Sequence, residues 1–218
     1  MEQVEKSEST IEYYQNNSSD LAKRYESANV DSVQELITKT FQEKSKLLEL
    51  GCGTGREISF LLKKGYDVLG TDASESMLTQ ALIYHPELEG RLTYLMMPSL
   101  IGVTQECFDG AYSVAMLMHL PKNDITASLN EVYKVLKTGG HFLFSISLIR
   151  DDVNEYGYDS KGRFFSSMSA DEWCELCRQT GFVITSKFYN KDGLGRDAIE
   201  WITLIITKEN GHHDSRIE

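Results

Sequence analysis

The sequence has little of what marks secreted, membrane or nucleic-acid-binding proteins. It contains four scattered cysteines, three prolines and no apolar run approaching the roughly 18 residues of a membrane span. Lys and Arg number 22 against 33 Asp and Glu, so the net charge is −11 and no basic face for duplex DNA or RNA is visible. With 41% hydrophobic residues, the composition is that of a globular protein. We therefore expect one cytoplasmic domain with reduced cysteines and no membrane segment.

A glycine-rich turn is the most informative stretch of the chain. An apolar run ends at Leu50, Gly51, Gly53 and Gly55 follow, and apolar residues then recur at helical spacing. This pattern predicts a strand, a tight turn and a helix. Glycines let the backbone turn and approach a ligand closely, and the start of a helix offers free N–H groups to an anion.

A second strand is predicted over residues 66–72, and it ends in the carboxylate of Asp72. This acid falls about 20 residues after the glycine turn, where nucleoside-binding α/β units hold ribose hydroxyls. A dinucleotide fingerprint needs its third glycine at the position that Arg56 occupies here. The spacing therefore disfavours a nicotinamide dinucleotide.

The segment Glu-Leu-Gly-Cys-Gly-Thr-Gly, residues 49–55, followed by Asp72, closely resembles the first two motifs of the class I S-adenosylmethionine-dependent methyltransferases. The resemblance covers about residues 10–208 and implies an α/β, Rossmann-like fold. That fold has a mostly parallel seven-stranded sheet in the order 3-2-1-4-5-7-6, helices on both faces and an antiparallel C-terminal β-hairpin. We expect N-terminal lid helices over residues 1–45, the methyltransferase domain over 46–208 and a flexible tail over 209–218.

The N-terminal segment is expected to cover the cofactor. Polar residues 1–8 predict a disordered end, a capping box at Ser9 predicts a helix start, and the polar run 16–20 predicts a break. Small methyltransferases of the resembling family begin with a Tyr-Tyr…Ala…Arg-Tyr segment that forms a lid. By that resemblance, Tyr14 and Arg24 lie near the methionine moiety of S-adenosylmethionine. The alternative is that the tyrosines only pack this helix onto the sheet.

Further cofactor contacts are implied by the same resemblance. The candidates at or just after the predicted strand ends are Gly51, Cys52, Gly53, Gly55, Asp72, Ala73, Met77 and Met116. Many family members carry an acid after the third strand that binds the adenine amino group, but here this place falls on Met97 or Pro98. We expect backbone groups or the Ser99 hydroxyl to bind adenine instead, with Met97 stacking on the ring.

His119 follows the predicted fourth strand, where open α/β sheets place their ligands. It is a candidate catalytic base, or it only holds its loop. Tyr14 is the second candidate base. Methyl transfer needs a base only where the acceptor loses a proton.

The acceptor side is expected to include residues 150–168, an irregular stretch rich in aromatic and charged groups. Arg150 is the candidate contact for an anionic or carbonyl group, and Tyr13 and Tyr158 are further substrate candidates. Some small bacterial methyltransferases end with a segment similar to Leu194–Arg196 and Trp201, so Arg196 and Trp201 are candidates too. The alternatives are a solvated surface loop for 150–168 and a core position for Trp201.

The ends of the remaining helices are predicted from their capping residues. Asn123 is the predicted N-cap of one helix, which Gly139 and Gly140 are predicted to end, and a capping box at Ser169 starts another. Two cysteines, Cys174 and Cys177, fall inside that last helix without a second pair, so we expect no metal site.

We expect an S-adenosylmethionine-dependent methyltransferase that acts on a small-molecule acceptor, as a monomer or homodimer, with neither a nucleic-acid nor a membrane partner. The alternatives are methylation of a tRNA or a protein side chain, a nicotinamide-dependent reductase, and a non-catalytic cofactor-binding partner subunit.

Overall fold

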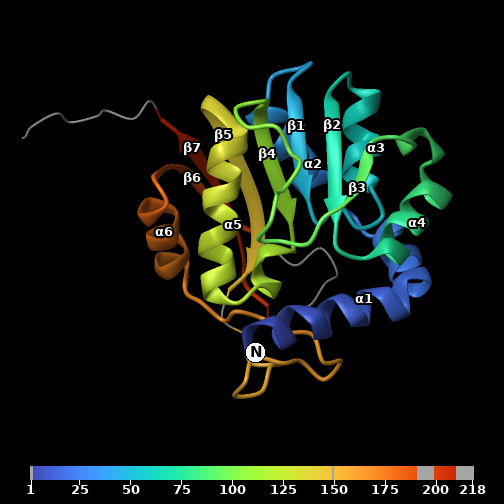
Figure 1. Ribbon diagram of the computed structural model, residues 1–218, viewed down its shortest axis with the longest axis vertical. Helices are drawn as coiled ribbons and strands as arrows, with labels where there is room; N and C mark the ends of the chain where they lie inside the picture. The colour runs from blue at the N-terminus through green and yellow to red at the C-terminus, as the bar shows by residue number, and fades with distance from the viewer. Residues whose placement is uncertain (1, 149, 191–198, 210–218) are drawn as a thin grey trace, which may run out of the picture.

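The computed structural model describes residues 2–148, 150–190 and 199–209. Its seven-stranded sheet has the order β3-β2-β1-β4-β5-β7-β6, as the resemblance implied (Figure 1). Strands β1 (Lys46–Leu50), β2 (Asp67–Asp72), β3 (Leu92–Tyr94), β4 (Phe108–Val114) and β5 (Leu136–Ser147) are parallel. The predicted hairpin, β6 (Phe182–Asn190) and β7 (Trp201–Lys208), adds the antiparallel edge.

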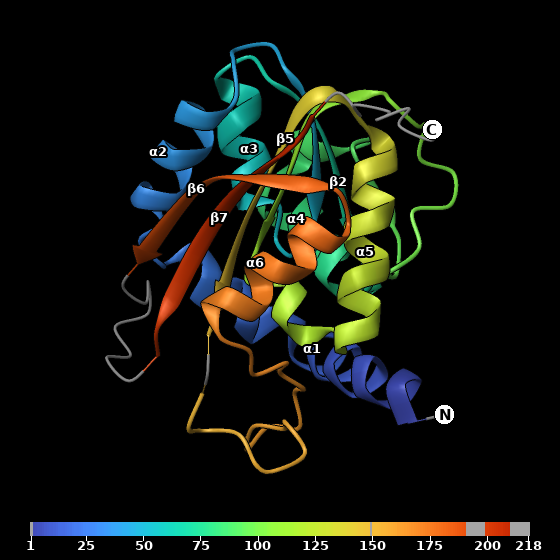
Figure 2. The same ribbon diagram turned by 90° about the vertical axis from the view of Figure 1, so that its left-hand side faces the viewer.

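Helices cover both faces of the sheet (Figures 1 and 2). One face carries α2 (Asp31–Thr40), α3 (Arg56–Lys63) and α4 (Glu75–Tyr84), and the other carries α5 (Lys122–Val135) and α6 (Ala170–Gln179). Two short 3₁₀ turns, η1 (Pro86–Leu88) and η2 (Leu117–His119), complete the connections. Helix α1 (Glu2–Glu26) lies across the end of the sheet at which the parallel strands finish. Among the described residues, no helix is both long and apolar enough to cross a membrane.

The sheet separates two apolar cores. On the α5–α6 face, Trp173 is fully buried against Phe144 of β5, with ring centroids 5.9 Å apart. On the other face, Phe41 packs directly onto Gly110 of β4, where a Cβ would come within 2.2 Å of its ring. Phe41 directly follows α2, so this contact fixes the end of α2 against the sheet.

Helix α1 differs from its prediction. It begins at Glu2 rather than at Ser9, and it continues through the polar run 16–20 without a break. Contacts with α4 explain the continuity, because the Gln15 side-chain oxygen accepts hydrogen bonds from the Ser74 hydroxyl (2.9 Å) and the Ser76 N–H (3.2 Å). Tertiary contacts thus outweigh the low helix propensity of this run.

The end signals of the other helices are partly confirmed. Ser74 caps α4 by accepting from the Met77 N–H, and Ser169 forms the predicted capping box. The N-cap of α5 is Pro121, not Asn123. Gly139 and Gly140 do not end α5, which stops at Val135, but lie within β5.

Candidate active site

A cavity of about 210 Å³ lies at the carboxyl ends of the parallel strands, and residues of α1 form one of its walls. The carboxyl ends of parallel strands are where open α/β sheets bind ligands. Five segments line it: the end of β1 with the glycine turn and the start of α3, the residues after β2, those after β3, those after β4 and one side of α1.

The three glycines of the turn serve different purposes. All adopt positive φ, at 71° for Gly51, 53° for Gly53 and 72° for Gly55. A Cβ on Gly51 would lie 2.4 Å from Met116 Cγ, and one on Gly55 would lie 2.3 Å from Leu88 Cδ1. A Cβ on Gly53 would meet only Met77 Cε, at 3.6 Å. Packing of the protein therefore requires the outer two glycines, whereas Gly53 leaves space open in the cavity.

The Asp72 side chain is hydrogen-bonded to the glycine turn, and both line the cavity. One of its oxygens accepts the Gly53 N–H at 2.8 Å and the other accepts the Ser74 N–H at 2.9 Å. Burial raises the pKa of the carboxyl, and the backbone N–H bonds oppose that rise. An ionised carboxylate offers about four acceptor positions, so acceptor capacity remains for a ligand diol.

Glu49 is a cavity residue that our sequence reasoning did not single out. It lies at the end of β1, is 1% exposed, and accepts a hydrogen bond from the Tyr112 hydroxyl at 3.0 Å. Burial, reinforced by the charge of Glu57, raises its pKa well above the usual value. The signal was available, because an acid inside an apolar strand is unusual unless it is paired or functional.

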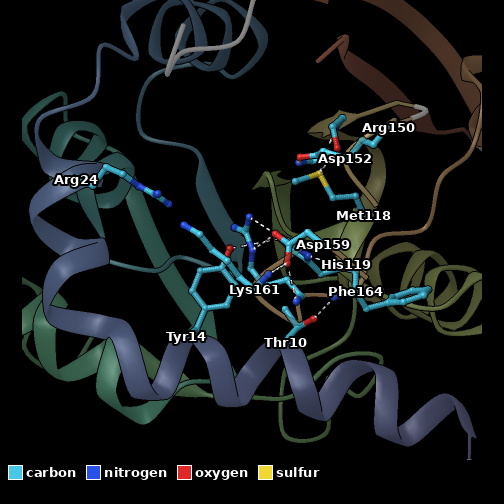
Figure 3. A network of polar contacts seen from close by, with 12 residues as sticks. Thr10, Tyr14, Arg24, Met118, His119, Arg150, Asp152, Asp159, Lys161 and Phe164 are labelled. Carbon is cyan, nitrogen blue, oxygen red and sulfur yellow. Dashed lines mark hydrogen bonds and ion pairs between the residues drawn. The ribbon is translucent and has the colours of Figure 1, made fainter. Parts of the chain in front are cut away.

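His119 and Tyr14 form an uncharged pair (Figure 3). His119 Nδ1 lies 2.7 Å from the Phe164 carbonyl oxygen, which can only accept, so Nδ1 carries the hydrogen and Nε2 is the ring nitrogen that accepts. The Tyr14 hydroxyl lies 3.4 Å from that Nε2. Burial lowers the pKa of His119 to about 4 and raises that of Tyr14 well above 10.0. Both side chains are therefore neutral at physiological pH.

The main chain of Phe164 joins three segments. Its carbonyl accepts from His119 after β4, and its N–H donates to Thr10 Oγ1 of α1 at 2.9 Å. The following residue, Phe165, packs against the His119 ring at a tilt of 54°, with centroids 4.4 Å apart. We call this connection of α1, η2 and the 150–168 loop the Phe164 clamp. The type of residue 164 does not predict it, because Phe164 takes part in both bonds through main-chain atoms.

The structure places some of the predicted cofactor residues in the cavity lining and others outside it. Those that line the cavity are Tyr14, Gly51, Cys52, Gly53, Asp72, Ala73, Met77, Met97 and Met116. Gly55, Pro98, Ser99 and Arg24 are not among the lining residues. The Arg24 guanidinium lies 3.5 Å from the Tyr25 hydroxyl, and Tyr25 itself does line the cavity.

The predicted substrate residues are outside the cavity lining. Tyr13, Arg150, Tyr158 and Trp201 do not line the cavity, and Arg196 lies outside the described residues. Arg150 binds Asp152 through its Nε and Nη2 atoms, and its guanidinium carbon lies 4.0 Å from the centroid of the Phe165 ring. Trp201 is half-buried against the main apolar core.

The α6 cysteines are remote from this chemistry. Cys174 and Cys177 are both buried, and burial raises the pKa of the Cys177 thiol to about 12. Within residues 2–148, 150–190 and 199–209, no group of three or more His, Cys, Asp or Glu side chains could hold a metal ion.

The profile of the methyltransferase-domain family matches residues 21–187, which include the glycine turn, Asp72 and His119. The chain belongs to this family. Its motifs and strand order are those of the class I, S-adenosylmethionine-dependent methyltransferases.

Known relatives support the same assignment. The ubiquinone biosynthesis O-methyltransferase of Alkalilimnicola ehrlichii is 29% identical over 105 residues, which are 47% of this chain and 42% of that protein. The 18S rRNA (guanine-N(7))-methyltransferase RID2 of Arabidopsis thaliana is 29% identical over 109 residues, or 46% and 37% of the two chains. The matched region spans less than half the length of either relative.

Solved structures share the fold of this methyltransferase domain. The Burkholderia thailandensis 1,6-didemethyltoxoflavin-N1-methyltransferase, solved with its substrate and S-adenosylhomocysteine, has a TM-score of 0.78. The match covers 95% of this chain and 91% of that one at 16% identity.

The cavity of this methyltransferase domain fits S-adenosylmethionine, the cofactor of the family. Gly53 leaves open the space that a side chain would fill, and the Asp72 carboxylate, held on that side by two backbone N–H groups, retains acceptor capacity for ribose hydroxyls. Buried Glu49 supplies an acceptor for a cationic group.

Proposed function

We propose that this protein transfers the methyl group of S-adenosylmethionine to a small-molecule acceptor. The observation that carries the proposal is the Phe164 clamp, which joins the 150–168 loop to the cavity-lining residues Thr10 of α1 and His119. An enclosed site of this kind suits an acceptor that can be surrounded, and the net charge of −11 disfavours a nucleic-acid polymer.

S-adenosylmethionine supplies an electrophilic methyl group on a good sulfonium leaving group, so the chain has mainly to align the reactants. In this scheme Asp72 and the turn at Gly53 orient the nucleoside, and α1 with its clamp excludes water. Orientation of this kind contributes about 7–11 kcal/mol to lowering a barrier. The lone pair on His119 Nε2 is placed to receive a proton from the acceptor.

Two measurements test this proposal. Calorimetric titration is expected to show binding of S-adenosylhomocysteine and none of NADH. Methyl-labelled S-adenosylmethionine is then incubated in parallel with a low-molecular-weight metabolite extract, with tRNA and with a protein extract. We expect label in the small-molecule arm. Label confined to tRNA or protein would favour the polymer alternatives, and cofactor binding without transfer in any arm would favour a non-catalytic partner subunit.

The low pKa of His119 predicts a specific dependence of stability on pH. Because burial lowers this pKa from 6.5 to about 4, the unfolded chain takes up the proton first as the pH falls. Above pH 6.5 His119 is neutral in both the folded and the unfolded state, so it does not change the free energy of unfolding. Between pH 6.5 and about 4 the proton binds only to the unfolded chain, and the free energy of unfolding falls. We expect urea unfolding to show that wild type loses roughly 2–3 kcal/mol more than His119→Gln across this window. Equal losses in the two proteins would contradict the assignment of a buried, neutral imidazole.

A further inference from the structure

One end of the cavity is set apart by the residues that line it. Ser7, Thr10, Ile11 and Tyr14 of α1 face this end together with His119 and Leu120, which follow β4. We call these six residues the acceptor end. None of the six belongs to the glycine turn or to the segment after β2, and we assign recognition of the group to be methylated to them.

The acceptor end contains no ionised side chain. His119 and Tyr14 are neutral, and the other four members are hydroxyl or aliphatic residues. Apart from His119, Arg56 is the basic side chain among the described lining residues, and it is held by Glu57 at 2.8 Å and by the Tyr25 carbonyl. The lining carboxyls Glu49 and Asp72 would repel an anion.

The two guanidinium groups of the 150–168 loop are already paired with carboxylates. Arg150 is paired with Asp152, and Arg163 is paired with Asp159 through two nitrogens, at 2.9 and 2.6 Å. Neither arginine lines the cavity. Arg163 is close enough to Tyr14 and His119 to lower the pKa of both, but Asp159 already balances its charge. An acceptor bearing a carboxylate or a phosphate would therefore be buried at the acceptor end without an unpaired counter-charge, which is costly.

A second, independent observation concerns the hydroxyl group of Ser7. Ser7 is 8% exposed and lines the cavity, yet its hydroxyl has no hydrogen-bond partner among the residues that the structure describes. The neighbouring hydroxyls on α1 are satisfied, since Ser9 donates to the Lys6 carbonyl at 3.1 Å and Thr10 accepts from Phe164. Buried polar groups without a partner are rare and destabilising, and a bound ligand supplies such a partner.

We propose that the acceptor is an uncharged hydroxyl compound that is methylated on oxygen, an inference that rests on the proposed methyl transfer. Its reacting O–H donates to His119 Nε2, and a second polar group of the same molecule bonds to the Ser7 hydroxyl.

The atoms and charges balance in this reaction. An oxygen–carbon bond forms as the carbon–sulfur bond breaks, and the bonding electrons leave with sulfur, which becomes a neutral thioether. The hydroxyl proton passes to His119 Nε2 and from there to solvent. Because Nε2 is unprotonated throughout the neutral range, it is available as the acceptor of that proton.

Fractionation of the small-molecule arm tests the charge of the acceptor. A metabolite extract is separated by ion exchange at neutral pH into anionic, neutral and cationic fractions, and each is incubated with the enzyme and methyl-labelled S-adenosylmethionine. We expect label in the neutral fraction, in a product that mass spectrometry identifies as an O-methyl ether. Label only in the anionic or the cationic fraction, or on nitrogen, would overturn the inference while leaving the proposed function standing. No label in any fraction would overturn the small-molecule proposal itself.

Ser7→Ala tests the specificity contact, with Ser9→Ala as the matched control on the same helix. For the labelled neutral acceptor, we expect Ser7→Ala to raise KM roughly tenfold, with kcat nearly unchanged, because one hydrogen bond to the ligand is lost. Affinity for S-adenosylhomocysteine should not change in either variant, which shows that both fold correctly. An unchanged KM in Ser7→Ala, or an equal rise in Ser9→Ala, would overturn the role of Ser7.

Discussion

Gly53→Val is expected to abolish measurable binding of S-adenosylhomocysteine in a folded protein. A Cβ at this position meets no backbone atom and only the flexible end of Met77 at 3.6 Å, so the protein itself tolerates the added atoms. The isopropyl group would occupy the cavity beside Asp72, where the ligand has to lie. Calorimetric titration with S-adenosylhomocysteine is expected to give no heat of binding at concentrations that saturate the wild type.

Gly65→Val is the control for backbone strain. Gly65 adopts a φ of +87°, also in the left-handed region, and a Cβ there meets nothing within 4 Å. A valine at either glycine is expected to cost about 1–3 kcal/mol of stability through its backbone conformation. Gly65→Val should therefore unfold at a similarly reduced denaturant concentration and still bind the cofactor product. Retained binding by Gly53→Val would show that the nucleoside does not lie against this turn.

Asp72→Ala is expected to weaken S-adenosylhomocysteine binding by roughly 1.5–3 kcal/mol, the value of hydrogen bonds to a charged group. The variant loses the carboxylate itself and the partner that fixes the Gly53 N–H and the Ser74 N–H. Titration calorimetry measures the change in Kd, and circular dichroism checks that the variant is folded.

Asp67→Ala provides the matched control at the other end of β2. Asp67 is exposed and pairs with Arg91 at 2.7 Å, far from the carboxyl end of the strand. Removing it should leave the cofactor affinity unchanged. Equal affinities of Asp72→Ala and Asp67→Ala would remove the basis for assigning Asp72 to the ribose.

The sheet was predictable because its signals are local. Each buried strand reads as a short apolar run, and the glycine turn with Asp72 identifies the family and hence the strand order. The failures occurred where a distant contact decides the local structure. The run 16–20 stays helical because α1 packs on α4, and Gly139 and Gly140 belong to β5 because α5 already ends at Val135.

The site was predictable on its cofactor side and less so on its acceptor side. Gly53, Asp72 and Met77 stand at fixed distances from a strand end, so sequence spacing places them in the cavity. The acceptor end is assembled from α1 and η2, and the Phe164 clamp joins the His119 and Thr10 side chains through main-chain atoms of Phe164. Residue type alone therefore drew attention to Arg150, which Asp152 already binds, and not to Ser7.

A crystal structure of this protein with S-adenosylhomocysteine tests the central claim most directly. The account predicts that the ribose hydroxyls lie within hydrogen-bond distance of the Asp72 carboxylate, with the nucleoside passing over Gly53 and the sulfur facing the acceptor end at His119. A nucleoside bound in another part of the molecule, or an Asp72 side chain turned away from the ribose, would contradict it.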